Sequence, residues 1–156
     1  MKEELKEGIS NYLKRFNKYS KEEYIDLEYK RVNKDKSKNA ELFKKKLAEQ
    51  KLCCYFCNTD IRDIQSLIKN NLIYPRKRGK YGYSGMHFEI EHLNADKTNN
   101  AESNIVLACY CCNNDKSNTI EPEIFKEFFG KQKSVSYKYL MEEKNIKSDV
   151  LYWHYL

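Results

Sequence analysis

Apolar side chains recur every three or four positions through the first third of the chain, which is the spacing of amphipathic helices. This spacing predicts one helix over residues 5–16 and another over residues 42–47. Between them, Ser20 and Glu23 have the spacing of a capping box, in which each side chain accepts from the backbone N–H of the other residue. A further helix is therefore expected to begin near Ser20 and to end before the polar stretch at residues 33–39.

The middle of the chain changes from helical to strand periodicity. An amphipathic helix is predicted over residues 61–68, and residues 74–85, rich in glycine and tyrosine, are predicted to be a loop. From Met86 onward apolar and polar side chains alternate, which predicts a half-buried strand. The β-branched run at residues 104–108 predicts a second strand after a polar loop.

Helical signals return after Cys109. A short helix is expected to follow this residue, Pro122 suits the first turn of the next helix, and Gly130 is expected to end that helix. Apolar side chains over residues 140–156 predict a final helix that packs on the core. Helices at both ends around two short strands predict an α+β fold.

The composition fits a single domain of 156 residues, with 40% hydrophobic and 33% charged residues. No apolar run approaches the roughly 20 residues of a membrane span, and residues 1–10 lack the apolar core of a signal peptide. A cytoplasmic protein without membrane contact is expected.

The net charge is +6, and residues 1–52 carry much of the excess, with 15 basic against 10 acidic side chains. Such a surface can attract nucleic acid, although lysine-rich helices are more often only solvated.

Six cysteines gather in two clusters, at residues 53–57 and 109–112. In a reducing compartment such clusters indicate a metal site rather than disulfides. Two Cys-x-x-Cys pairs, Cys54 with Cys57 and Cys109 with Cys112, have the composition of a structural zinc site with four thiolate ligands. Cys53 and Cys111 are then surplus, although either could replace its neighbour as a ligand. The alternative for all six is that they are buried thiols or form a disulfide.

Polar residues follow these clusters in a specific order: Glu91-His92 ends the first predicted strand, Asn104 begins the second, and Asn113 and Lys116 follow Cys112. Over residues 53–119 this order is similar to that of the HNH endonucleases. The resemblance implies a small ββα-metal core clamped by structural zinc and flanked by N- and C-terminal helices. Residues 1–52 would be a basic helical extension, residues 53–120 the nuclease core, and residues 121–156 helices that pack on the core.

The resemblance also implies catalytic roles. His92 would be the general base, Glu91 and Asn113 would hold a catalytic Mg²⁺ or Mn²⁺, and Asn104 would brace the loop behind His92. Many members have a second histidine where this chain has Asn113, but an amide oxygen can also bind a hard cation. Glu89 and Asp96 are rival ligands.

The chemistry of phosphodiester hydrolysis supports these roles, because it needs an activated water and neutralisation of charge on the phosphate. An imidazole can take the proton from water near neutral pH. Lys116 and the basic residues Arg76, Lys77 and Arg78 are predicted to contact phosphates, their alternatives being a solvated helix face and a solvated loop.

Two classes of function follow. The first is an endonuclease acting on double-stranded DNA, with flanking helices that contact DNA or form a homodimer interface. The second is a catalytically inactive zinc-knuckle module that binds nucleic acid or protein. A zinc-dependent hydrolase is disfavoured, because the sequence has no His-x-x-x-His ligand pair.

Overall fold

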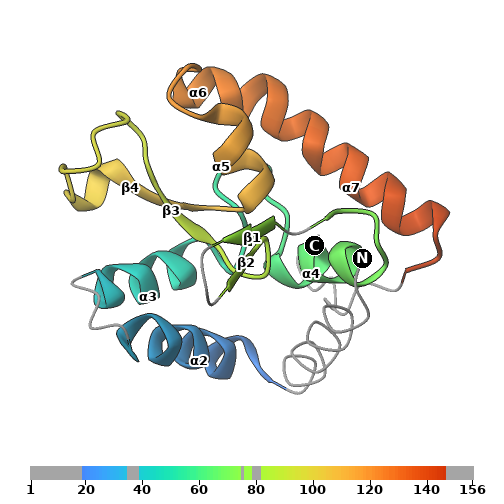
Figure 1. Ribbon diagram of the computed structural model, residues 1–156, viewed down its shortest axis with the longest axis horizontal. Helices are drawn as coiled ribbons and strands as arrows, with labels where there is room; N and C mark the ends of the chain where they lie inside the picture. The colour runs from blue at the N-terminus through green and yellow to red at the C-terminus, as the bar shows by residue number, and fades with distance from the viewer. Residues whose placement is uncertain (1–18, 35–38, 75, 79–81, 147–156) are drawn as a thin grey trace, which may run out of the picture.

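The protein folds into helices arranged around two small antiparallel sheets, as Figure 1 shows for a computed structural model of the chain. The structure describes residues 19–34, 39–74, 76–78 and 82–146. The helices are α2 (Lys21–Lys34), α3 (Ala40–Glu49), α4 (Ile61–Lys69), the 3₁₀ turn η1 (Glu102–Asn104), α5 (Tyr110–Lys116), α6 (Pro122–Ile124), the π-helical turn η2 (Phe125–Gly130) and α7 (Lys131–Glu143). The strands are β1 (Arg76–Arg78), β2 (Gly82–Ser84), β3 (Glu89–His92) and β4 (Ile105–Ala108). The predicted α+β class is confirmed.

The predicted capping box at the start of α2 is confirmed. The backbone N–H of Ser20 donates to Glu23 Oε2 at 2.7 Å, and the N–H of Glu23 donates to Ser20 Oγ at 3.2 Å. The helices predicted near residues 42–47 and 61–68 correspond to α3 and α4. The helix predicted over residues 5–16 and the end of the chain after residue 146 lie outside the described residues.

The two strand pairs confirm one prediction and contradict another. In the β3–β4 hairpin, Glu91 pairs with Val106 and His92 with Ile105, as two short strands joined by a polar loop should. Residues 74–85, predicted to be a loop, instead contain the β1–β2 hairpin. Each of these strands is three residues long, too short for alternation to distinguish it from a loop.

One hydrophobic core joins all three predicted segments of the chain. Tyr24 of α2 and Phe43 of α3 are buried in the same cluster as Leu107 of β4 and Phe125 of η2. Figure 1 shows α2 and α3 side by side, below the β3–β4 hairpin. Residues 19–49 therefore pack on the same core as the rest of the described chain.

The free edge of β4 is completed by a side chain. The Gln50 amide donates to the carbonyl oxygen of Leu107 and accepts from its N–H, both at 2.8 Å. The N–H of Tyr55 also donates to the Leu107 oxygen, at 3.0 Å. Gln50 thus fixes the end of α3 to β4, next to the first cysteine pair, and satisfies backbone groups that burial would otherwise leave unpaired.

Gly130 does not end a helix as predicted. Its backbone has right-handed helical dihedral angles, and η2 continues directly into α7, which ends at a cap on Lys144. A Cβ atom at residue 130 would lie 2.3 Å from the carbonyl oxygen of Phe56. Glycine is required here because the helix backbone approaches the loop of the first cysteine pair closely, not because a turn begins.

None of the described helices combines the length and the apolar character that crossing a bilayer requires.

A buried carboxylate joins α2 to the segment before β3. Glu28 is 2% exposed; it accepts from the Arg31 guanidinium at 2.8 Å and lies 2.9 Å from His87 Nδ1. Burial by itself would raise the pKa of Glu28, but the hydrogen bond and charge of His87, together with Arg31, outweigh it and lower the pKa to about 2.

This low pKa makes the stability of the protein depend on acid pH. Because the pKa of Glu28 falls from 4.5 to about 2 on folding, its stabilisation is complete above about pH 4.5 and is lost as the pH falls through 2. The loss should be on the order of 3 kcal/mol. Urea unfolding at a series of pH values should show a shallower acid slope for Glu28→Gln than for the parent. Glu22→Gln, at an exposed position of the same helix, should follow the parent curve; equal slopes for all three proteins would contradict the assignment.

Candidate metal centre and active site

Four buried cysteines from the two clusters meet in one place. The sulfur atoms of Cys54, Cys57, Cys109 and Cys112 all lie within 4.8 Å of one another. Cys54 and Cys57 lie on the loop between α3 and α4, while Cys109 and Cys112 lie at the start of α5, where Cys109 Sγ accepts from the Cys112 N–H at 3.5 Å. Four sulfur atoms at such distances can hold a metal ion such as zinc, as the two Cys-x-x-Cys pairs predicted.

The protonation of this group favours a cation. Hydrogen bonds from Cys109, Cys112 and Cys54 lower the pKa of Cys57, so one thiolate is stabilised by its three neighbours. Hydrogen bonds to Cys112, Cys54 and Cys57, together with burial, raise the pKa of Cys109 far above its usual range. Four buried thiolates would repel one another unless a positive charge lay between them, and a bound metal ion would supply that charge.

The surplus cysteines lie outside the metal group. Cys53 and Cys111 are only half-buried, and Cys53 Sγ lies 3.6 Å from the carbonyl oxygen of Lys51. Burial and the nearby Asp60 raise the pKa of the Cys53 thiol to about 12, which disfavours a thiolate there.

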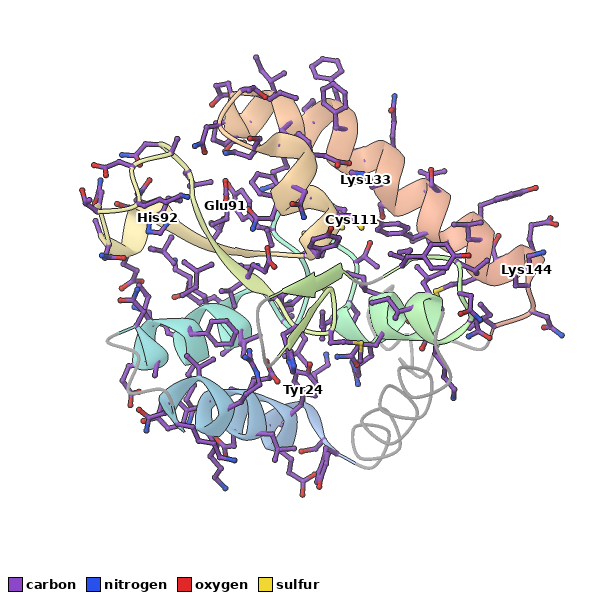
Figure 2. All side chains as sticks on the ribbon, in the orientation of Figure 1. Tyr24, Glu91, His92, Cys111, Lys133 and Lys144 are labelled. Atoms are coloured by element: carbon purple, nitrogen blue, oxygen red, sulfur yellow. The ribbon has the colours of Figure 1, made fainter. Side chains whose placement is uncertain are left out.

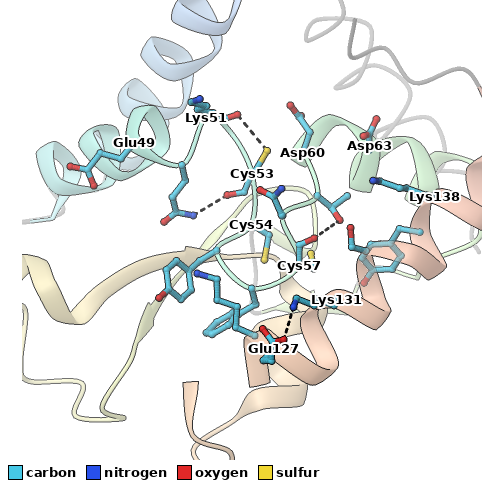
Figure 3. A pocket seen from close by; sticks show the side chains of 18 of the residues that line it. Glu49, Lys51, Cys53, Cys54, Cys57, Asp60, Asp63, Glu127, Lys131 and Lys138 are labelled. Carbon is cyan, nitrogen blue, oxygen red and sulfur yellow. Dashed lines mark hydrogen bonds and ion pairs between the residues drawn. The ribbon is translucent and has the colours of Figure 1, made fainter. Parts of the chain in front are cut away.

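Figure 3 shows Cys53, Cys54 and Cys57 on the loop that lines a groove of about 920 Å³ facing η2 and α7. This groove shares no lining residue with the cleft described next.

A polar cleft of about 650 Å³ brings together three of the four predicted catalytic residues, and Asn104 does not line it. Glu91 and His92 line it from the end of β3, and Asn113 lines it from the first turns of α5. In Figure 2 Glu91 lies nearer to α5, and His92 nearer to the loop between β3 and β4. The chain continues from β3 through this loop to β4 and then directly to α5, so the hairpin and the helix form the walls of the cleft.

Both acidic residues of β3 are held by side chains of α5. Lys116 Nζ lies 2.7 Å from Glu91 Oε1 and also donates to the carbonyl oxygen of Ser117 at 2.9 Å. The Asn113 amide nitrogen donates to Glu89 Oε2 at 2.5 Å. Each helix residue thereby fixes the orientation of a carboxylate. Because the Asn113 nitrogen is the donor, its carbonyl oxygen remains available to a cation.

The position of Lys116 corrects a prediction. We predicted that this residue contacts a phosphate, with a solvated helix face as the alternative, but its side chain is 1% exposed and lies 2.7 Å from Glu91 Oε1. A buried ammonium needs a paired anion, and Glu91 provides one. For Arg76, Lys77 and Arg78 the structure gives the backbone of β1, and their side chains lie outside the described part.

His92 has a partner that sequence reasoning missed. Its Nε2 lies 3.4 Å from Asn100 Oδ1, and Asn100 in turn accepts from the amide of Asn39 at the start of α3, at 3.2 Å. Lys45 of α3 binds Glu102 at 2.6 Å, so α3 holds the β3–β4 loop at two points. The only sequence signal was the abundance of asparagine in residues 94–104, which periodicity does not interpret.

Asn104 bridges the two ends of the loop behind His92. It accepts from the backbone N–H of Asn94 at 3.0 Å and donates to the carbonyl oxygen of Asn99 at 2.8 Å. This is the bracing position that the resemblance implied. Asp96, a rival metal ligand, is exposed, accepts from Thr98 within the same loop and does not line the cleft.

No family model matches this chain, and neither the curated proteins nor the solved structures include a match to it.

Proposed function

We propose that the chain is a metal-dependent endonuclease of the HNH type, which hydrolyses phosphodiester bonds in double-stranded DNA. One observation carries this proposal: the adjacent residues Glu91 and His92 of β3 line the same cleft as Asn113 of α5. The order of β3, β4 and α5 is what a ββα-metal core requires, and the four-cysteine group beside it suits a structural zinc ion.

In this proposal His92 takes a proton from the attacking water. If the Nε2–H of His92 donates to Asn100 Oδ1, the lone pair lies on Nδ1, which can accept that proton. Asn104 keeps the loop, and with it the partner of His92, at a constant position.

The donors in the cleft suit a hard cation such as Mg²⁺ or Mn²⁺. Lys116 binds Oε1 of Glu91, which leaves Oε2 as a ligand, and Asn113 contributes its amide oxygen. Such a cation would neutralise charge that develops on the phosphate and on the leaving oxygen. Glu89 is then a positioning group for Asn113 rather than a ligand.

Incubation of the purified protein with supercoiled plasmid tests the proposal. Nicked or linear DNA should form with Mg²⁺ or Mn²⁺ and not with EDTA, and a catalytically inactive His92→Ala variant should exclude a contaminating nuclease. DNA that stays intact with every divalent cation would overturn the proposal.

A second candidate is an inactive zinc-knuckle module that binds nucleic acid or protein. The pairing of Lys116 with Glu91 favours it, because the lysine already neutralises the carboxylate that a catalytic cation would need. Binding of DNA without cleavage under the same conditions would support this candidate. In either case the basic excess of residues 1–52 should make binding weaken as salt rises.

A further inference from the structure

The outer face of the C-terminal helices carries an apolar stripe. Helix α6, the π-helical turn η2 and α7 form one continuous helical rod, because Gly130 and Lys131 keep right-handed helical dihedral angles. On this rod five large apolar side chains are exposed. Phe129 (45%) stacks on the buried Phe125, and the other four form the stripe, which are Ile124 (51%), Phe128 (63%), Val135 (68%) and Tyr139 (59%). The opposite face is the one that packs on the core, through Phe125, Tyr137 and Met141.

These four residues lie on one side of the rod. Their spacings are four, seven and four residues, which are close to whole turns both in an α-helix and in the wider π-helical turn that carries Phe128, so the four side chains stay on one side of the rod. An aromatic side chain has roughly 150–250 Å² of surface, so at these exposures the stripe offers roughly 400 Å² per chain. The largest apolar patch of a monomeric protein is typically about 300–600 Å² and is often functional, so the stripe is large enough to be a contact surface.

The spacing of the four stripe positions is the same in both chain directions. Turning a second copy of the rod antiparallel brings Ile124 of one copy opposite Tyr139 of the other, and Phe128 opposite Val135. An interface related by a twofold axis has this property, because each contact between two residues occurs twice. We propose that two copies of this chain associate through the apolar stripe, antiparallel, with the twofold axis passing between Lys131 and Gln132.

The charges beside the stripe agree with this arrangement. With the axis at that position, Glu127 of one copy and Lys138 of the other are about half a helical turn apart, measured along the rod. Their opposite charges attract each other, and this contact occurs twice in the dimer. The charge of Lys131, near the axis, is already neutralised within its own chain by Glu127 at 2.5 Å, a pair drawn in Figure 3. Gln132, which is uncharged, occupies the centre of the stripe between Phe128 and Val135.

The area predicts how stable the dimer is. Two stripes of this size bury roughly 800 Å² of apolar surface, and the flanking polar side chains bring the total near the lower limit of about 1,200 Å² for specific interfaces. The dimer should therefore be reversible and should depend on protein concentration.

Sedimentation or light scattering over a range of concentrations tests the proposal. The mass should rise from the 18.7 kDa of one chain towards twice that value. Phe128→Ser and Val135→Ser should each weaken association by about tenfold or more, and both positions are exposed enough for the fold to persist. Tyr74→Ser is the matched control, because Tyr74 is 66% exposed but lies outside the rod.

A cross-link identifies the orientation. In the antiparallel pair, Gln132→Cys lies next to its own copy and should form a covalent dimer under mild oxidation. Ser136→Cys lies farther from the axis along the rod and should not, and neither should the parent protein. A parent protein that stays monomeric, or a Phe128→Ser variant that associates like the parent, would overturn the proposal and leave the stripe to a different partner protein. Because mass and cross-linking are measured without DNA, their outcome is independent of nuclease activity.

Discussion

Replacing His92 with alanine is expected to abolish DNA nicking, by a factor on the order of 10² or more for the loss of a positioned proton acceptor. Metal content and DNA affinity should persist, because His92 is only partly buried and contacts no residue of the cysteine group. The rate of plasmid nicking at saturating Mg²⁺ measures the loss of activity, and a binding curve on the same DNA measures the affinity.

The proposed ligands of the catalytic cation should behave differently from the proposed base. Glu91→Gln keeps an oxygen to accept from the buried Lys116 but removes the charge that would bind the cation, so the loss of activity should be partly reversed by more Mg²⁺ or Mn²⁺. Asn113→Ala should respond in the same way. Asn114→Ala is the control, because Asn114 lines the same cleft but its amide is bound to the carbonyl oxygen of Tyr110.

The contrast between these variants tests the roles assigned to His92 and Glu91. A His92→Ala protein that nicks DNA at the parent rate would exclude His92 as the base. If high Mg²⁺ restored His92→Ala and not Glu91→Gln, the roles of the two residues would be assigned wrongly.

Removing one of the four clustered cysteines should have the largest effect on stability. Cys109→Ala takes away a ligand that is 1% exposed, and the free energy of metal binding in such sites is part of the free energy of folding. We expect loss of about one bound zinc ion per chain and loss of cooperative thermal unfolding. Elemental analysis and calorimetry measure the two effects.

The surplus cysteines provide matched controls within the same loops. Cys53→Ser and Cys111→Ser should keep the metal content of the parent, because neither sulfur belongs to the four-sulfur group. If Cys111→Ser lost the metal while Cys112→Ser kept it, the ligand set would be shifted by one residue. Native protein without any zinc would refute the metal assignment as a whole.

Local patterns in the sequence determined most elements of the fold. The capping box at Ser20, the helical spacing of α3 and α4, and the alternation around Glu89–His92 each act within one turn or one strand, so they can be recognised without tertiary structure. The four-cysteine group was also predictable, because two Cys-x-x-Cys pairs have the spacing that a single metal site requires.

Tertiary structure alone decided the interactions between distant segments. Lys116 had the sequence features of a surface lysine, and only the packing of α5 against β3 buries it on Glu91. Glu28 likewise became a buried charge because His87, 59 positions along the chain, lies beside it. Gly130 was predicted to end a helix, but the structure shows that glycine is needed there because the backbone of Phe56 lies so close. These contacts depend on how elements pack in space, and a periodicity read along one element contains no information about what faces it.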